Sequence, residues 1–105
     1  MPSTRIIRYL SDYEFHDFLR QYKNRITVNE HAYFRLSEMQ RKVYKEGALL
    51  KTLKEEKPIR VGIQQNGRYA AFYHRKEGYL RIVFKVSSPG IEIITFYLMD
   101  YLPQL

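Results

Sequence analysis

The chain contains no cysteine among its 105 residues. This absence excludes disulfide bonds, thiolate metal sites and cysteine catalysis, and it is typical of proteins in the reducing cytoplasm. Long apolar runs are missing too: nothing approaches the roughly 18 residues of a membrane-spanning helix. The N-terminal stretch "MPSTRIIRYL" lacks the apolar core and cleavage site of a signal peptide. We therefore expect a soluble, cytoplasmic protein with no membrane partner.

The sequence also lacks the familiar catalytic motifs. It contains no P-loop, no G-x-G-x-x-G, no G-x-S-x-G and no H-E-x-x-H. Its three histidines, His16, His31 and His74, do not have the spacing of a metal site. We therefore predict no metal and no cofactor. Whether the protein is an enzyme stays open, and any activity is expected to be metal-independent.

Positive charge is abundant. Lysine and arginine total 18 against 11 acidic residues, which gives a net charge of +7. Such a field attracts nucleic-acid phosphates, acidic proteins or anionic membranes. Nucleic acid is the partner that this charge suggests first, and the alternative is a solvated basic surface that only keeps the protein soluble. The length fits one domain over 1–105, and 45% hydrophobic residues favour a folded chain.

The first half of the chain has helical periodicity. "RIIRYL" at 5–10 predicts a short strand. Ser11 and Glu14 then form a capping box, in which each side chain bonds the other residue's free backbone N–H, and this predicts a helix over 12–23. Its apolar residues follow the helical spacing: they are Phe15, Phe18, Leu19 and Tyr22.

A second capping box, at Thr27 and Glu30, predicts a longer helix that continues to about residue 56. Gly47 is expected to break or kink it, because glycine costs about 1 kcal/mol inside a helix. The charged run "KEEKP" ends the pattern, since proline cannot continue a helix. The apolar stripe before the glycine comprises Ala32, Leu36, Met39 and Val43.

After Pro58 the hydrophobic period changes from 3.6 to 2, which predicts strands. Four such runs are separated by turn residues: "IRVGIQQ", "RYAAFYH", "YLRIVFKV" and "IEIITFYL". They predict a curved four-stranded antiparallel meander over about 59–98. With the helical part over about 11–56, the expected class is α+β, with the N-terminal strand and the helices packed on the sheet.

Asn66 and Gly67 predict a hairpin with a two-residue type I′ turn, which would pair Gln65 with Arg68. In this register one face of the sheet is apolar, and we expect the helices to cover it. It would carry Val61, Ile63, Ala70, Phe72, Leu80, Ile82, Phe84 and Val86. The other face would carry Arg60, Gln64, Tyr69, Tyr73, Arg81 and Lys85.

Four residues of this second face form a candidate nucleic-acid-binding site, because tyrosines stack on unpaired bases while cations hold phosphates. They are Arg60, Tyr73, Arg81 and Lys85. Two alternatives stay open. Polar residues always occupy the solvent side of such a sheet, and the same cations fit an acidic protein partner.

His31 and Arg35 form a candidate catalytic pair in the first turns of the predicted second helix. The helix dipole there disfavours an imidazolium, so a neutral His31 can accept a proton. Arg35 lies one turn later on the same face. Together they suit RNA cleavage, with the histidine as general acid or base and the arginine on the phosphate. The alternative is a capping or packing histidine beside a solvated arginine.

The segment "ITVNEHAYFR", with His31-Ala32-x-x-Arg35, resembles the T-x-H-A-x-x-R start of small domains related to BrnT and RelE/ParE toxins. "GYLRIVFKV" and "IEIITFY" resemble their closing strands, so the similarity covers about 26–98. It implies a RelE-like fold and a metal-free ribonuclease that an acidic antitoxin neutralises. His31 and Arg35 match the opening motif, and Arg60, Arg81 and Lys85 match cations by strand only. The N-terminal strand and helix lie outside that plan.

Three hypotheses follow. The first is an RNA-binding protein of RelE-like architecture that cleaves RNA without metal. The second is a non-catalytic module that binds nucleic acid or an acidic protein through the same face. The third is a protein whose sheet mediates self-association. The oligomeric state, the RNA sequence and the existence of an antitoxin stay open.

Overall fold

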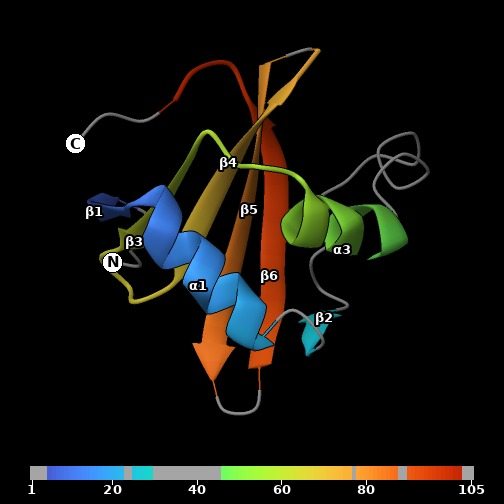
Figure 1. Ribbon diagram of the computed structural model, residues 1–105. Helices are drawn as coiled ribbons and strands as arrows, with labels where there is room; N and C mark the ends of the chain where they lie inside the picture. The colour runs from blue at the N-terminus through green and yellow to red at the C-terminus, as the bar shows by residue number, and fades with distance from the viewer. Residues whose placement is uncertain (1–4, 23–24, 30–45, 77, 88–89, 103–105) are drawn as a thin grey trace.

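The computed structural model describes residues 5–22, 25–29, 46–76, 78–87 and 90–102. These residues form six strands and two helices, and both helices lie against the same face of one sheet (Figure 1). The α+β class is therefore confirmed. In chain order the elements are β1 (Ile6–Leu10), α1 (Asp12–Tyr22), β2 (Ile26–Val28), α3 (Glu46–Glu55), β3 (Arg60–Gln64), β4 (Tyr69–Arg75), β5 (Gly78–Ser87) and β6 (Gly90–Met99).

The sheet is mixed and open, with the strand order β1-β3-β4-β5-β6-β2. From β3 to β6 each strand pairs antiparallel with the next. β1 adds antiparallel to β3 at one edge, and β2 adds parallel to β6 at the other. The sheet therefore has six strands among the described residues rather than the four predicted. Neither described helix is long and apolar enough to cross a membrane.

The N-terminus of α1 has the predicted capping box. The Ser11 N–H donates to Glu14 Oε1, and the Glu14 N–H donates to Ser11 Oγ, both at 3.1 Å. The two bonds satisfy backbone donors that have no partner within the helix. Helix α1 then presents Phe15 and Phe18 to the sheet. The prediction of a helix here is confirmed.

The second predicted capping box is wrong at its first residue. Thr27 lies in strand β2, where it is opposite Glu92 of β6, while its neighbours Ile26 and Val28 pair with Ile91 and Ile93. Alternating burial of the isoleucine and valine against β6 stabilises the strand, and this outweighs the local capping pattern. The rest of that prediction, Glu30 and the stripe from Ala32 to Val43, lies outside the described residues.

The hairpin between β3 and β4 has a three-residue loop instead of the predicted two-residue turn. The Gly67 N–H donates to the Gln64 carbonyl at 2.9 Å, and the Gln64 N–H donates to the Arg68 carbonyl at 2.7 Å. Gly67 has a φ of 86°, and no other residue than glycine has a positive φ in the described part of the chain. A type I′ turn needs positive φ at both central residues, so Asn66 excludes it.

This change of turn shifts the register by one residue. Val61 pairs with Ala71 and Ile63 with Tyr69, whereas the prediction paired them with Phe72 and Ala70. Because side chains alternate between the faces of a sheet, a shift of one residue moves all of β4 to the opposite face. Tyr73 therefore lies among the buried residues on the helix-covered side.

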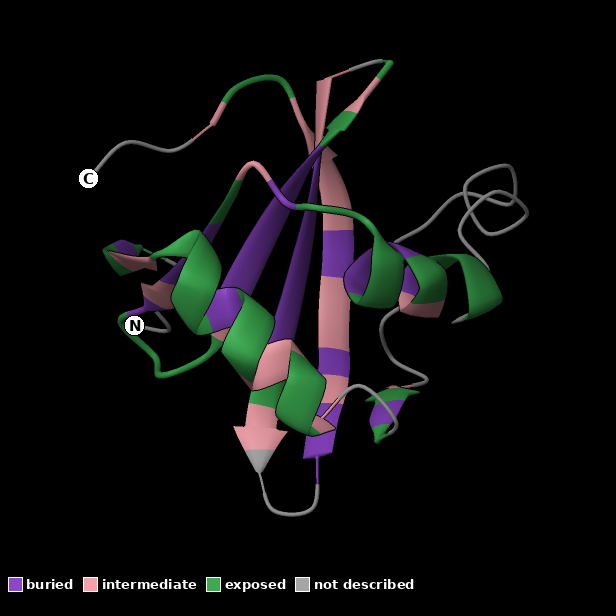
Figure 2. Ribbon diagram, viewed as in Figure 1, coloured by how far each residue is buried: buried purple, intermediate pink, exposed green. Residues whose placement is uncertain are grey.

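The main core lies between the sheet and the two helices. Leu49 and Leu53 of α3 are fully buried, and so are Ile82 and Phe84 of β5. Strands β4 and β5 are buried along most of their length, while the outer faces of both helices are exposed (Figure 2). We call the other side of the sheet the open face, because no described helix covers it. It carries Ile6, Tyr9, Arg60, Gln64, Ala70, Phe72, His74, Tyr79, Arg81, Val83, Lys85 and Tyr97.

A bidentate ion pair between Arg75 and Glu56 joins the end of α3 to β4. Arg75 Nη1 and Nη2 lie 3.0 and 2.9 Å from the two carboxylate oxygens of Glu56, and Nη2 also donates to Thr52 Oγ1 at 3.2 Å. The Arg75 guanidinium lies 5.9 Å from the ring of Tyr73. Burial, together with the Glu56 charge, raises the pKa of Tyr73 far above its ordinary value, so the phenol stays neutral.

We expect this ion pair to make stability depend on pH. Partial burial opposes ionisation of Glu56, but hydrogen bonds with Arg75 and Thr52 outweigh it and lower the pKa of Glu56 below 4.5. Stability from a lowered carboxyl pKa is present above the unfolded pKa and is lost as the pH falls through the folded value. Glu56→Gln should therefore cost about 1 kcal/mol at neutral pH and almost nothing near pH 3, as measured by urea unfolding. Glu55→Gln, at an exposed position beside it, should show no such loss.

Candidate nucleic-acid interface

Aromatic and cationic side chains alternate across the open face. The strand register places Arg60 of β3 opposite Phe72 of β4, Phe72 opposite Arg81 of β5, and Arg81 opposite Tyr97 of β6. Tyr9 of β1 extends the series, because the Arg60 guanidinium lies 5.3 Å from its ring centroid. We call these five residues the aromatic–cation row. It crosses five of the six strands.

Arg81 is the centre of this row. Its guanidinium lies 5.1 Å from the ring centroid of Phe72 and 5.7 Å from that of Tyr97, within the range of cation–π attraction. Its Nη2 donates to Gln64 Oε1 at 2.6 Å. Desolvation lowers the pKa of Arg81, an effect that Tyr97 and Tyr9 oppose. Arginine stays protonated in proteins, so the row has a fixed positive charge between its rings.

Burial divides the row into a hidden middle and accessible ends. Phe72 is fully buried and Arg81 is only 4% exposed, whereas Arg60 is exposed and Tyr9 and Tyr97 are partly exposed. Phe72 belongs to a second apolar cluster with Ile6, Ala70 and Val83, against which Met99 and Leu102 also pack. Arg81 is therefore placed to hold rings in position, and Arg60 is placed to meet a ligand.

Lys85 lies further along β5 in a polar network. Its Nζ is 3.2 Å from Glu92 Oε1, and Asn29 Nδ2 donates to Glu92 Oε2 at 3.0 Å. The hydrogen bonds from Asn29 and Lys85 lower the pKa of Glu92, and the positive charge of the exposed Arg68 contributes as well. Two cations thus face one carboxylate, and the Lys85 side chain stays half exposed. This part of the open face keeps a positive balance.

The structure therefore brings together three of the four predicted binding residues. Arg60, Arg81 and Lys85 lie on one face, as expected, but Arg81 is buried against aromatic rings. The placement of Tyr73 beside them is wrong: it is 1% exposed on the helix-covered side, because of the register shift in β4. The predicted catalytic residues His31 and Arg35 lie outside the described residues.

The sequence interpretation missed the two tyrosines at the ends of the row. Tyr97 was hidden by a bulge in β6: Val83 pairs with Thr95 and Phe84 with Ile93, which leaves Ile94 as an extra residue. Without it, uniform alternation from Ile91 would place Tyr97 beneath the helices. For Tyr9, alternation within "RIIRYL" was available, but the pairing of β1 with β3 was needed to assign its face.

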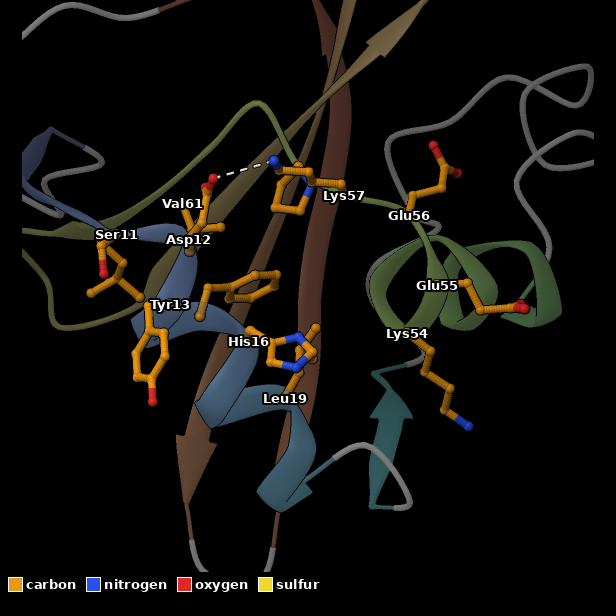
Figure 3. Close-up of a pocket in the computed structure, with 13 residues that line it drawn as sticks. Ser11, Asp12, Tyr13, His16, Leu19, Lys54, Glu55, Glu56, Lys57 and Val61 are labelled. Atoms are coloured by element: carbon orange, nitrogen blue, oxygen red, sulfur yellow. Dashed lines mark ion pairs between the residues drawn. The ribbon is translucent and has the colours of Figure 1, made fainter.

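A groove between α1 and α3 is the other candidate site, with a volume of about 520 Å³. Its apolar lining includes Phe15, Leu19 and Val61. Figure 3 shows His16 and Lys54 on opposite sides of it, and Lys57 Nζ forms an ion pair with Asp12 Oδ2 at 3.3 Å. Cationic and acidic side chains are mixed around this groove, so its charge favours neither an anionic nor a cationic ligand. The described residues contain no group of three side chains suited to hold a metal.

Comparisons with family models, with curated proteins and with solved structures find no match for this chain. The residues of the open face are therefore the basis on which its function is inferred.

Proposed function

We propose that this protein binds RNA through the open face of its sheet, as a protein of the cytoplasm. One observation carries the proposal: aromatic and cationic side chains alternate across five strands on a face that no described helix covers. Proteins that bind single-stranded nucleic acid combine these two residue types, because cations attract the backbone and rings stack on bases. The net charge of +7 adds a long-range attraction for phosphates.

Each residue has a distinct part in this proposal. Arg60 and Lys85, whose side chains reach solvent, would contact phosphates. Tyr9 and Tyr97, which are partly exposed, would stack on bases. Arg81 is buried against Phe72 and Tyr97, so it would act as a positioning residue that fixes the ring of Tyr97. RNA is preferred to duplex DNA because a ring can stack only on an unpaired base.

Two finer proposals concern what happens to the RNA and what else binds. The similarity to RelE/ParE-type toxins suggests metal-independent cleavage, with His31 as general acid or base and Arg35 on the phosphate. It also suggests an acidic antitoxin-like partner that would occupy the same cations as RNA. The second candidate function is therefore a binding module for an acidic protein. The tyrosines distinguish RNA binding from binding of an acidic protein. A carboxylate-rich partner needs Arg60 and Lys85 but no tyrosine that stacks on a base.

The first test is a titration of the full chain into labelled single-stranded RNA in EDTA, at about 50 and about 200 mM salt, that follows binding and cleavage together. Binding that weakens at the higher salt is expected, because phosphate contacts release counterions. Cleavage that persists in EDTA and is lost in His31→Ala would support the ribonuclease. Binding without cleavage leaves a binding module. If RNA does not bind at either salt concentration, the proposed function is wrong.

A further inference from the structure

We infer that the bound RNA is a single strand that crosses the β-strands and stacks one base on Tyr9 and another on Tyr97. This inference rests on the proposed function and adds the path and minimum length of the ligand. The two rings lie at opposite ends of the aromatic–cation row, on β1 and β6. Both rings are partly exposed, and each lies beside the guanidinium group of an arginine.

The separation of the two rings follows from the strand order. Strands β3, β4 and β5 lie between β1 and β6, so the path crosses four interstrand gaps. Since neighbouring strands are about 4.8 Å apart, this path is about 19 Å long. Side chains project roughly perpendicular to a sheet, so the exposed rings have a similar separation.

The middle of the row offers no third stacking position. Phe72 is fully buried, and Arg81 is 4% exposed. Within the row, the bases between the two tyrosines would therefore meet no accessible ring, and two further rings of the open face, His74 and Tyr79, lie two residues along β4 and β5 from it. Arg60, which is exposed beside Tyr9, is placed to hold a phosphate at that end.

The length of RNA that reaches both rings can be bounded. A stacked strand rises about 3.4 Å per nucleotide and an unstacked strand about twice that, so about 19 Å corresponds to roughly three to six steps, or a strand of about four to seven nucleotides. An octanucleotide can bridge both tyrosines. A dinucleotide can occupy only one of them. The two ligands should therefore respond differently to the loss of one ring.

The test compares Tyr9→Leu, Tyr97→Leu and the wild-type full chain in NMR titrations with an RNA dinucleotide and an RNA octanucleotide. Leucine keeps an apolar side chain against the cluster of Ile6, Ala70, Phe72 and Val83 but removes the ring. For the octanucleotide, either substitution should weaken binding at least about tenfold, because one linked stacking contact is lost. For the dinucleotide, either should weaken binding at most about twofold, because the other ring still binds it.

Tyr13→Leu is the matched control, since Tyr13 is 81% exposed on α1 and should matter for neither ligand. Equal losses at both lengths would overturn the bridging inference and leave RNA binding by one tyrosine. Octanucleotide binding that resists both tyrosine substitutions but is weakened by Arg60→Gln would also overturn bridging, while the open face remains the site. Failure of the wild type to bind the octanucleotide would overturn the proposed function itself.

Discussion

Replacing Phe84 with alanine should lower the free energy of unfolding by about 3–5 kcal/mol, the cost of removing a fully buried aromatic side chain and leaving a cavity. Phe84 is fully buried on the helix-covered side of β5. Its ring centroid lies 5.5 Å from that of Tyr69, with the rings nearly parallel, and 6.2 Å from that of Phe18. Phe18 belongs to α1, so the same ring joins β4, β5 and the first helix.

Urea unfolding followed by circular dichroism measures this loss. Val86→Ala, two residues further along the same face of β5, is the matched control, because Val86 is only partly buried against the core. It should cost about 1 kcal/mol. A loss of similar size in both variants would mean that Phe84 does not occupy the centre of the core, and it would contradict the register of β5.

Neutralising Arg60 and Lys85 together should weaken single-stranded RNA binding by about 50-fold at about 50 mM salt. Each phosphate contact on a single strand contributes about 0.7 to the slope of log K against log salt, and two lost contacts at this salt concentration correspond to that factor. The slope itself should fall by about 1.4. The expected effect is large because both side chains reach solvent on the open face. The test compares the double variant Arg60→Gln/Lys85→Gln with the wild type, and fluorescence anisotropy measures the affinity of each for single-stranded RNA.

Lys51→Gln/Lys54→Gln is the control for net charge. Both lysines are exposed on α3, on the opposite side of the sheet, so this variant removes the same two charges from the wrong face. It should weaken binding only a few-fold, through the general field of the protein. Equal losses in the two double variants would show that RNA responds to total charge and that the open face is no specific site.

Local chemistry was enough to predict several elements. The Ser11–Glu14 capping box and the helical spacing behind it place α1 correctly. The change from a period of 3.6 to a period of 2 after Pro58 locates the strands of the second half. In β5 the alternation of side chains along the strand assigns Ile82 and Arg81 to their correct faces. Each of these patterns involves residues close together in the chain.

The errors arose where a single residue changes the outcome. The loop between β3 and β4 has three residues instead of the predicted two. The extra residue places Tyr73 beneath the helices and Phe72 on the open face. The extra residue Ile94 brings Tyr97 to the open face. Alternation fixes which residues share a face only within one uninterrupted strand, so turns and bulges decide how strands combine. Thr27 shows the same limit, because pairing with β6 is a long-range contact that a local capping pattern cannot reveal.

The most direct test of RNA binding by the open face is NMR chemical-shift mapping of the full chain during titration with an RNA octanucleotide. We predict that the largest changes fall on Tyr9, Arg60 and Tyr97, with smaller ones near Lys85, while α1 and α3 stay unchanged. Changes that concentrate instead on the groove between α1 and α3, around His16 and Lys54, would contradict the open face as the binding site.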